Sequence, residues 1–237
     1  MKFLIINPNM SKEMSDSITE VMNGVKNLNN SIEVVSNVLG FDSLESFYEY
    51  EVATAGMARI VKPLIKGDYD GILIACFGDP GLYAIREISK IPVYGIAELT
   101  LAGCYGIAGK YALIVAKKKA EFMMETMINQ YGLKDRLSGI YSVGIPVSDL
   151  SGNYEKTYSV LKDKVAQAID NGADTIIFGC AGFVPFACKI KEELRVNIVD
   201  PVTLGYKMME AYTEINIQPS RIGLYAYTND KELQNFE

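Results

Sequence analysis

The feature of this sequence that most restricts its fold is an internal repeat. Residues 70–78 read Asp-Gly-Ile-Leu-Ile-Ala-Cys-Phe-Gly, and residues 174–182 read Asp-Thr-Ile-Ile-Phe-Gly-Cys-Ala-Gly. In both copies an aspartate precedes a short apolar, β-branched run and a Cys-x-Gly group ends it, at the same intervals. Residues 2–6 and 110–114 give a weaker second match. Two buried strands can share such a pattern by chance, but a duplicated α/β unit explains both matches together.

Short apolar runs alternate with longer amphipathic segments, which is typical of βαβ units and a parallel sheet. We expect strands at 3–6, 32–38, 71–75, 92–95, 112–115, 140–143, 175–178 and 197–199. We expect helices at 11–27, 44–65, 82–89, 118–131, 154–171, 185–194 and 202–215. The predicted fold class is therefore α/β, with two pseudo-symmetric lobes that each hold a mostly parallel sheet of about four strands flanked by helices.

Composition limits the classes of function. The chain of 237 residues has a formal net charge of −6, which argues against a nucleic-acid partner and against a polybasic membrane anchor. The apolar run near its beginning is too short for a signal peptide, and no apolar stretch approaches the roughly 20 residues of a membrane span. We therefore expect a cytoplasmic protein with reduced cysteines and no membrane partner.

Histidine is absent from the sequence, and this excludes Ser-His-Asp and Cys-His nucleophile sites and the common His-based zinc sites. The four cysteines include no Cys-x-x-Cys pair, so we expect no metal site. Proton transfer near neutral pH has to use Cys, Asp, Glu, Lys or Tyr.

Cys76 and Cys180 are the strongest candidates for chemistry. Both follow a predicted strand of the repeat, and ligands of open α/β sheets bind beyond the carboxyl ends of the strands. The positive end of a following helix is expected to lower their thiol pKa values toward neutrality. Two facing lobes would then place one sulfur on each side of a carbon acid, as racemisation requires. For Cys104 and Cys188 we expect only small buried hydrophobic side chains.

At these residues the sequence resembles the hydantoin and allantoin racemases of the aspartate/glutamate racemase superfamily. The matching segments span almost the whole chain: INPN at 6–9, Ser-Leu-Glu at 43–45 with Tyr48, ACFGDPGL at 75–82, GIAE at 95–98, GCAG at 179–182 and Asp-Pro-Val at 200–202.

The resemblance implies a first lobe of residues 1–98 with 213–237, a second lobe of 99–212, and an active site in the cleft between them. It implies a racemase or epimerase of a small-molecule substrate that uses Cys76 and Cys180 as acid and base without a cofactor, and a homo-oligomer. It also gives these substrate-binding candidates: Asn7, Pro8, Asn9, Phe77, Gly78, Ala181 and Gly182.

The sequence departs from the family pattern at several of these positions. Met10 replaces the threonine that usually follows INPN, and Gly78 replaces one of two acidic residues, so that only Asp79 remains. The usual threonine pair aligns with Val115 and Ala116, and three lysines follow at 117–119. These changes should alter what the pocket binds.

Three functions remain open at this point. The first is racemisation of a 5-substituted hydantoin, allantoin or a related amino-acid derivative. The second keeps the fold but makes the protein a Cys-dependent isomerase or decarboxylase of a diacid. The third is a ligand-binding protein that retains the cysteines without turnover.

Overall fold

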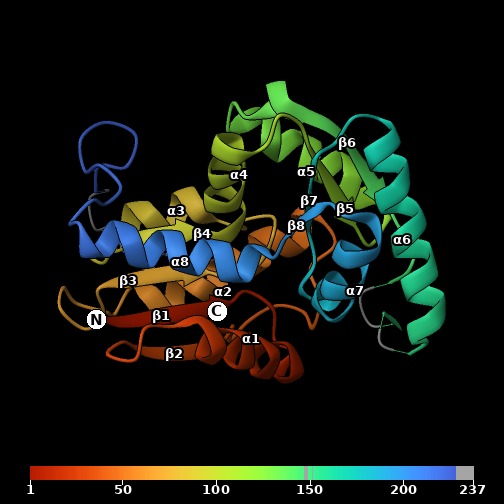
Figure 1. Ribbon diagram of the computed structural model, residues 1–237. Coiled ribbons are helices and arrows are strands. Elements are labelled where there is room, and N and C mark those ends of the chain that lie inside the picture. The colour runs from red at the N-terminus through yellow and green to blue at the C-terminus, as the bar shows by residue number, and fades with distance from the viewer. Residues whose placement is uncertain (147–148, 151, 228–237) are drawn as a thin grey trace.

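The computed structural model describes residues 1–146, 149–150 and 152–227, and it contains two four-stranded parallel sheets (Figure 1). The first sheet has the order β2-β1-β3-β4, with bounds β1 Lys2–Asn7, β2 Ser31–Ser36, β3 Gly71–Ile74 and β4 Val93–Gly95. The second has the order β6-β5-β7-β8, with bounds β5 Tyr111–Val115, β6 Leu137–Ser142, β7 Thr175–Phe178 and β8 Asn197–Val199. The two orders are equivalent, so the expected duplication and fold class are confirmed.

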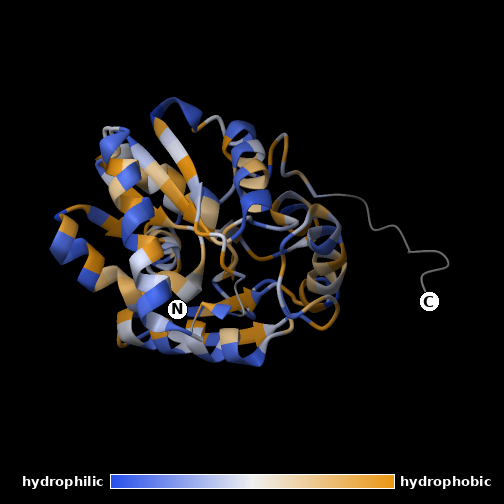
Figure 2. Cartoon of the chain, turned by 90° about the vertical axis from the view of Figure 1, so that its right-hand side faces the viewer, coloured by the Kyte–Doolittle hydropathy of each residue, from blue (hydrophilic) through white to orange (hydrophobic). Residues whose placement is uncertain are grey.

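The connections between strands are mainly helical. The helices are α1 Lys12–Val25, α2 Phe47–Val61, α3 Leu82–Ile88, α4 Ile96–Ile107, α5 Lys118–Gln130, α6 Tyr154–Asp170, α7 Val184–Leu194 and α8 Pro201–Glu214, with short 3-10 turns η1 Lys134–Arg136 and η3 Ala181–Phe183. Figure 2 shows that hydrophobic residues concentrate in the strands, whereas the outer helices carry many hydrophilic ones. This pattern is expected where helices cover both faces of parallel sheets.

The aspartates of the repeat begin equivalent strands. Oδ2 of Asp70 accepts a hydrogen bond from the backbone N–H of Lys2 at 2.7 Å. Oδ2 of Asp174 accepts from the backbone N–H of Gly109 at 2.8 Å and of Lys110 at 3.2 Å. Both aspartates therefore join the amino ends of neighbouring strands, at the far end from Cys76 and Cys180.

One apolar core runs through both lobes. It contains Phe3 and Ile5 of β1, Leu113 of β5 and Ile177 of β7, and residues of α4 such as Leu101 lie among them. Cys104, also on α4, is fully buried in this core, as expected. Because residues of both sheets pack in this one core, the core fixes the position of one sheet relative to the other. A site with one residue from each lobe requires this.

The last helix packs on the first sheet. α8 contacts α1, β3 and α4, and Figure 1 shows it crossing the first lobe beside β4. The division of the chain into 1–98 with 213–237 and 99–212 stays a prediction.

Two helix predictions were incomplete. No helix was expected at Ile96–Ile107, where α4 forms, because this segment is apolar around most of its circumference and contains two glycines. The helix expected from Leu44 begins instead at Phe47, because the side chain of Ser46 caps it by accepting from the backbone N–H of Glu49 at 3.2 Å. Residues 42–45 are thereby free to form a loop over the cleft.

Candidate active site

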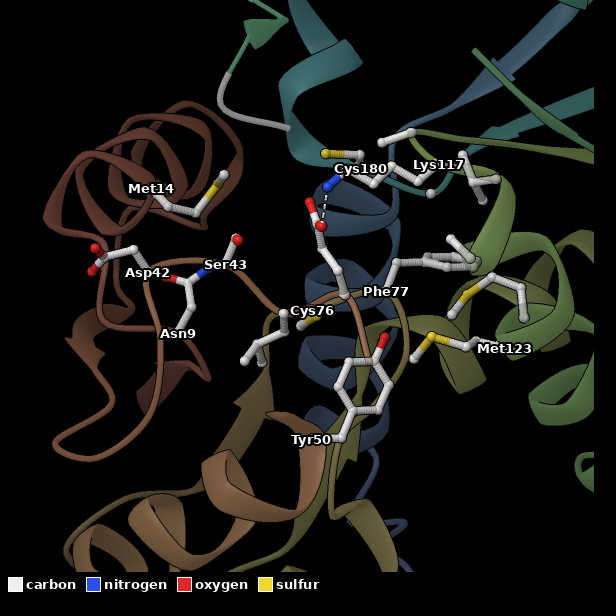
Figure 3. A pocket seen from close by; sticks show the side chains of 17 residues that line it. Asn9, Met14, Asp42, Ser43, Tyr50, Cys76, Phe77, Lys117, Met123 and Cys180 are labelled. Atoms are coloured by element: carbon white, nitrogen blue, oxygen red, sulfur yellow. Dashed lines mark hydrogen bonds and ion pairs between the residues drawn. The ribbon is translucent and has the colours of Figure 1, made fainter. Parts of the chain in front are cut away.

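A cavity of about 130 Å³ lies between the lobes, and both candidate cysteines line it (Figure 3). The other lining residues come from loops and helices of both lobes: Asn9, Met14, Asp42, Ser43, Leu44, Glu45, Tyr50, Phe77, Val115, Ala116, Lys117, Ala120, Met123, Met124 and Gly179. The structure therefore brings Cys76 and Cys180, which are far apart in the sequence, to one opening.

The strand ends explain this placement. The backbone N–H of Ala75 continues the ladder beyond β3 by donating to the carbonyl of Ile6 at 2.9 Å. The backbone N–H of Gly179 does the same beyond β7, donating to the carbonyl of Ile114 at 2.9 Å. Each cysteine is the next residue, so equivalent chain reversals in the two lobes direct the two cysteines to the shared cavity.

The expected lowering of the thiol pKa values was wrong. Burial raises the pKa of Cys76 to about 12, and the charges of Asp79 and Cys180 act in the same direction. Burial also raises the pKa of Cys180 to about 11, partly opposed by a backbone hydrogen bond from Gly182 and reinforced by the charge of Glu45. Both thiols are therefore protonated at neutral pH before substrate binds.

Backbone geometry explains the error. Neither sulfur lies at the first turn of an α-helix, because α3 does not begin until Leu82 and α7 not until Val184. The N–H groups of Gly78 and Asp79 donate to the carbonyl of Cys76, at 2.9 and 3.0 Å. At Cys76 these two donors close the turn, whereas at Cys180 the backbone N–H of Gly182 still forms a hydrogen bond with the thiol.

The Asn-Pro-Asn loop contributes one lining residue and two supports. Asn7 is buried and its amide nitrogen donates to Oδ1 of Asn9 at 2.8 Å and to Oγ of Ser15 at 3.0 Å. Pro8 is also buried, and its carbonyl accepts from the side chain of Asn37 at 2.9 Å. Of these three residues only Asn9 lines the cavity, and Asn7 and Pro8 lie behind it.

The other binding candidates divide in a similar way. Phe77 lines the cavity, whereas Gly78 lines a neighbouring one of about 270 Å³ that shares Tyr50 with it. A Cβ on Gly78 would come within 2.2 Å of the Tyr50 hydroxyl oxygen. The backbone N–H of Gly182 forms a hydrogen bond with the thiol of Cys180. Ala181 begins η3, and its side chain lies outside the described part of the structure.

The first-lobe loop at 42–45 and Tyr50 also line the cavity, which the sequence pattern did not predict. A signal was available, since residues 43–45 belong to the segments that resemble the racemases. Because the helix was expected to begin at Leu44, residues 44 and 45 were not expected to form a loop that lines the cavity. Of the three lysines, only Lys117 lines the cavity, and its ammonium group forms an ion pair with Glu45.

The cavity wall is mostly apolar. Val115 and Ala116, which stand in the threonine positions, both line it, as do Met123 and Met124 from α5. Met10 does not line the cavity, and 43% of its surface is exposed.

Cys188 is exposed on α7 rather than buried, so the expectation of a small buried side chain was wrong there.

Asp79 anchors the loop that carries Cys76. Its carboxylate accepts hydrogen bonds from the backbone N–H groups of Ala97 at 3.0 Å and Glu98 at 2.7 Å, at the start of α4. The hydroxyl of Tyr131 donates to Oδ2 of Asp79 at 2.8 Å. Burial raises the pKa of Asp79 to about 7, although these hydrogen bonds oppose the shift.

Comparison with known proteins agrees with this geometry. The model of the Asp/Glu/hydantoin racemase family matches residues 3–209. The chain belongs to this family. It is 30% identical to a hydantoin racemase of Pseudomonas sp. (strain NS671) over 241 residues, which covers 100% of this chain and 97% of that protein.

Other relatives and solved structures support the assignment. A hydantoin racemase of Paenarthrobacter aurescens is 27% identical over 234 residues, covering 98% of this chain and 99% of that protein. The structure of an allantoin racemase from Klebsiella pneumoniae superposes with a TM-score of 0.91 at 27% identity, covering 98% of this chain and 96% of that one. As a racemase-family enzyme, the chain is an isomerase. Within the described residues, none of the helices has the length and apolar character needed to cross a membrane.

Proposed function

We propose that this enzyme racemises a neutral 5-substituted hydantoin with an apolar substituent, using Cys76 and Cys180 as its two acid–base groups. The observation that carries the proposal is that both sulfur-bearing side chains line a single cavity between the lobes. Racemisation removes a proton from one face of a carbon and returns one to the other, so it needs a group on each side.

The reaction needs one thiolate and one thiol. The thiolate takes the proton from C5, and the electron pair of the C–H bond moves into the adjacent carbonyl, which becomes an enolate. The opposite thiol then gives its proton to the other face of C5 and is left as the thiolate. Starting from the other enantiomer exchanges the two roles, and no further reactant is required. A raised thiol pKa makes the thiolate a stronger base but leaves little of it at neutral pH, so the rate of proton removal should increase with pH.

The lining favours an apolar substituent over a polar one. Met14, Leu44, Phe77, Met123 and Met124 surround the space next to the cysteines. A ureido group, as in allantoin, would lose hydrogen bonds to water on entering such a wall. The hydroxyls that the threonine pair would supply are absent, since Val115 and Ala116 occupy those positions.

Charge in the cavity disfavours a diacid. In the described part of the chain, the charged lining residues are Asp42, Glu45 and Lys117, and the lysine is already paired with Glu45. A dicarboxylate would meet an excess of negative charge, whereas a neutral ring would not. This argues against the diacid isomerase or decarboxylase.

The test is incubation of the wild-type enzyme with single enantiomers in heavy water. The panel contains hydantoins with benzyl, isobutyl and hydroxymethyl substituents, allantoin, aspartate and glutamate, and both optical rotation and deuterium at the α-carbon are followed. We expect racemisation with deuteration, fastest for the benzyl and isobutyl hydantoins. Faster turnover of allantoin or of an amino diacid would overturn the substrate assignment, and binding without deuteration would overturn the reaction.

A further inference from the structure

Lys117 and Glu45 meet across the cleft, beside the two cysteines. Lys117 precedes α5 in the second lobe, and Glu45 belongs to the first-lobe loop before α2. Their ammonium and carboxylate groups form an ion pair, which Figure 3 draws as a dashed line inside the cavity. Since Lys117 and Glu45 both line the cavity, the pair lies where a bound substrate has to fit.

Among the lining residues that the structure describes, Lys117 is the only one with a cationic side chain. Its side chain is 41% exposed and that of Glu45 is 27% exposed, so both groups are partly withdrawn from water. Position 117 follows the two residues, Val115 and Ala116, that lack hydroxyl donors. The ammonium-bearing residue therefore directly follows the two positions in the cavity lining that lack a hydroxyl group.

The proposed reaction creates a negative charge that the cavity has to stabilise. Deprotonation of C5 moves charge to the neighbouring carbonyl oxygen, and an apolar wall provides no compensation for it. A fixed donor or cation aimed at such an oxygen is the usual means by which enzymes lower this kind of barrier. The described lining residues also offer the side-chain donors of Asn9, Ser43 and Tyr50, but of these residues Lys117 alone carries a positive charge.

We propose that Lys117 is a catalytic residue whose ammonium group donates a hydrogen bond to the substrate oxygen that becomes an enolate. This inference rests on the proposed racemisation. An ammonium group has three N–H donors, so Lys117 can keep its contact with Glu45 and offer another donor to the substrate. Glu45 is then a positioning residue, which holds the ammonium group across the cleft.

The experiment measures kcat and KM of the wild type and of Lys117→Met with the benzyl hydantoin. Loss of a charge-stabilising donor typically lowers kcat by roughly 100-fold or more, and we expect this with KM changed only a few-fold. Lys117→Arg keeps the charge and should recover part of kcat. Lys118→Met is the matched control, because the Lys118 side chain is 72% exposed and pairs with Glu121, away from the cavity lining.

A double variant distinguishes a direct hydrogen bond from Lys117 to the substrate from an indirect effect of Lys117 on the pKa of Cys180. Removing Lys117 leaves Glu45 unpaired, and the charge of Glu45 raises the pKa of Cys180. If that effect caused the loss, Glu45→Gln combined with Lys117→Met would restore kcat. We expect the double variant to stay as slow as Lys117→Met.

Recovery in the double variant, or an unchanged kcat in Lys117→Met, overturns the role of Lys117 and leaves the proposed function standing. Absence of turnover in the wild type overturns both.

Discussion

The hydroxyl of Tyr131 donates a hydrogen bond to Oδ2 of Asp79 at 2.8 Å, which links the end of a second-lobe helix to the loop that carries Cys76. Asp79 has a φ of +43°, a left-handed conformation that few residues other than glycine adopt but that aspartate tolerates. The loop is therefore fixed both by its own turn and by a contact from the opposite lobe. A change at either residue should alter stability and the properties of Cys76 together.

Asp79→Asn should change the pH dependence of stability. The pKa of Asp79 is raised from 3.8 to about 7 in the folded protein, so its contribution is fully present below pH 3.8 and is lost as pH rises through 7. Between pH 5 and 7 the wild type should lose roughly 2 kcal/mol of folding free energy that the variant does not lose. Urea unfolding at several pH values measures this difference. A stability difference between the two proteins that is independent of pH would contradict it.

Tyr131→Phe is the companion variant, since it removes a single hydrogen bond and leaves the carboxylate in place. We expect a loss of about 1 kcal/mol in the free energy of unfolding. Because the Tyr131 hydrogen bond lowers the pKa of Asp79, its removal should extend the pH dependence of stability to higher pH. The same urea titrations test both statements.

The rate should rise steeply with pH. The thiol pKa values of about 12 for Cys76 and about 11 for Cys180 mean that the form with one thiolate is rare in the free enzyme near neutrality. Below both values, kcat/KM should increase about tenfold per pH unit, because it reports the ionisation of free enzyme and substrate. Initial rates from pH 6.5 to 9 with a substrate that does not titrate in this range are the measurement. A plateau already present at pH 7 would mean that the thiol pKa values are lowered.

Glu45→Gln should act on one cysteine and not on the other. The charge of Glu45 contributes to the raised pKa of Cys180 but is not among the causes for Cys76. In a Cys76→Ala background, the pH midpoint for alkylation of Cys180 by iodoacetamide should therefore move down when Glu45 is replaced. A Cys180→Ala background is the control, in which the midpoint of Cys76 should not move. Equal shifts in both backgrounds would show that Glu45 acts through a general change in the cleft.

Asn7→Ala should reduce activity indirectly. The side chain of Asn7 donates to Asn9, Ser15 and the carbonyl of Ser11, so its removal takes a buried donor away from three partners. We expect a loss of about 1–3 kcal/mol in the free energy of unfolding and a weaker kcat/KM. Asn23→Ala, at an exposed position on α1, is the control and should be close to neutral. An unchanged kcat/KM in Asn7→Ala would mean that the position of Asn9 is unimportant.

Much of the fold could be predicted because its signals are local. The repeated Asp and Cys-x-Gly fall at the two ends of β3 and β7, and alternation of apolar and amphipathic runs located every strand. α4 was missed because its sequence is buried on most sides, so that no polar face marks it as a helix.

The site was only partly predictable. The two cysteines could be placed at strand ends, but the pairing of Glu45 with Lys117 depends on how the lobes face each other, which no local pattern records. The direction of the thiol pKa shifts depends on burial and on the direction of backbone donors, and both follow from tertiary structure.

The central claim is that Cys76 and Cys180 act on opposite faces of one carbon, and the most direct test uses the two alanine variants. Single enantiomers of the benzyl hydantoin are incubated in heavy water with Cys76→Ala or Cys180→Ala, and α-deuterium and optical rotation are followed. We expect neither variant to racemise the substrate, while each still exchanges the α-proton of one enantiomer, and the two variants act on opposite enantiomers. Racemisation at the wild-type rate by both variants, or exchange of the same enantiomer by both, would contradict the account.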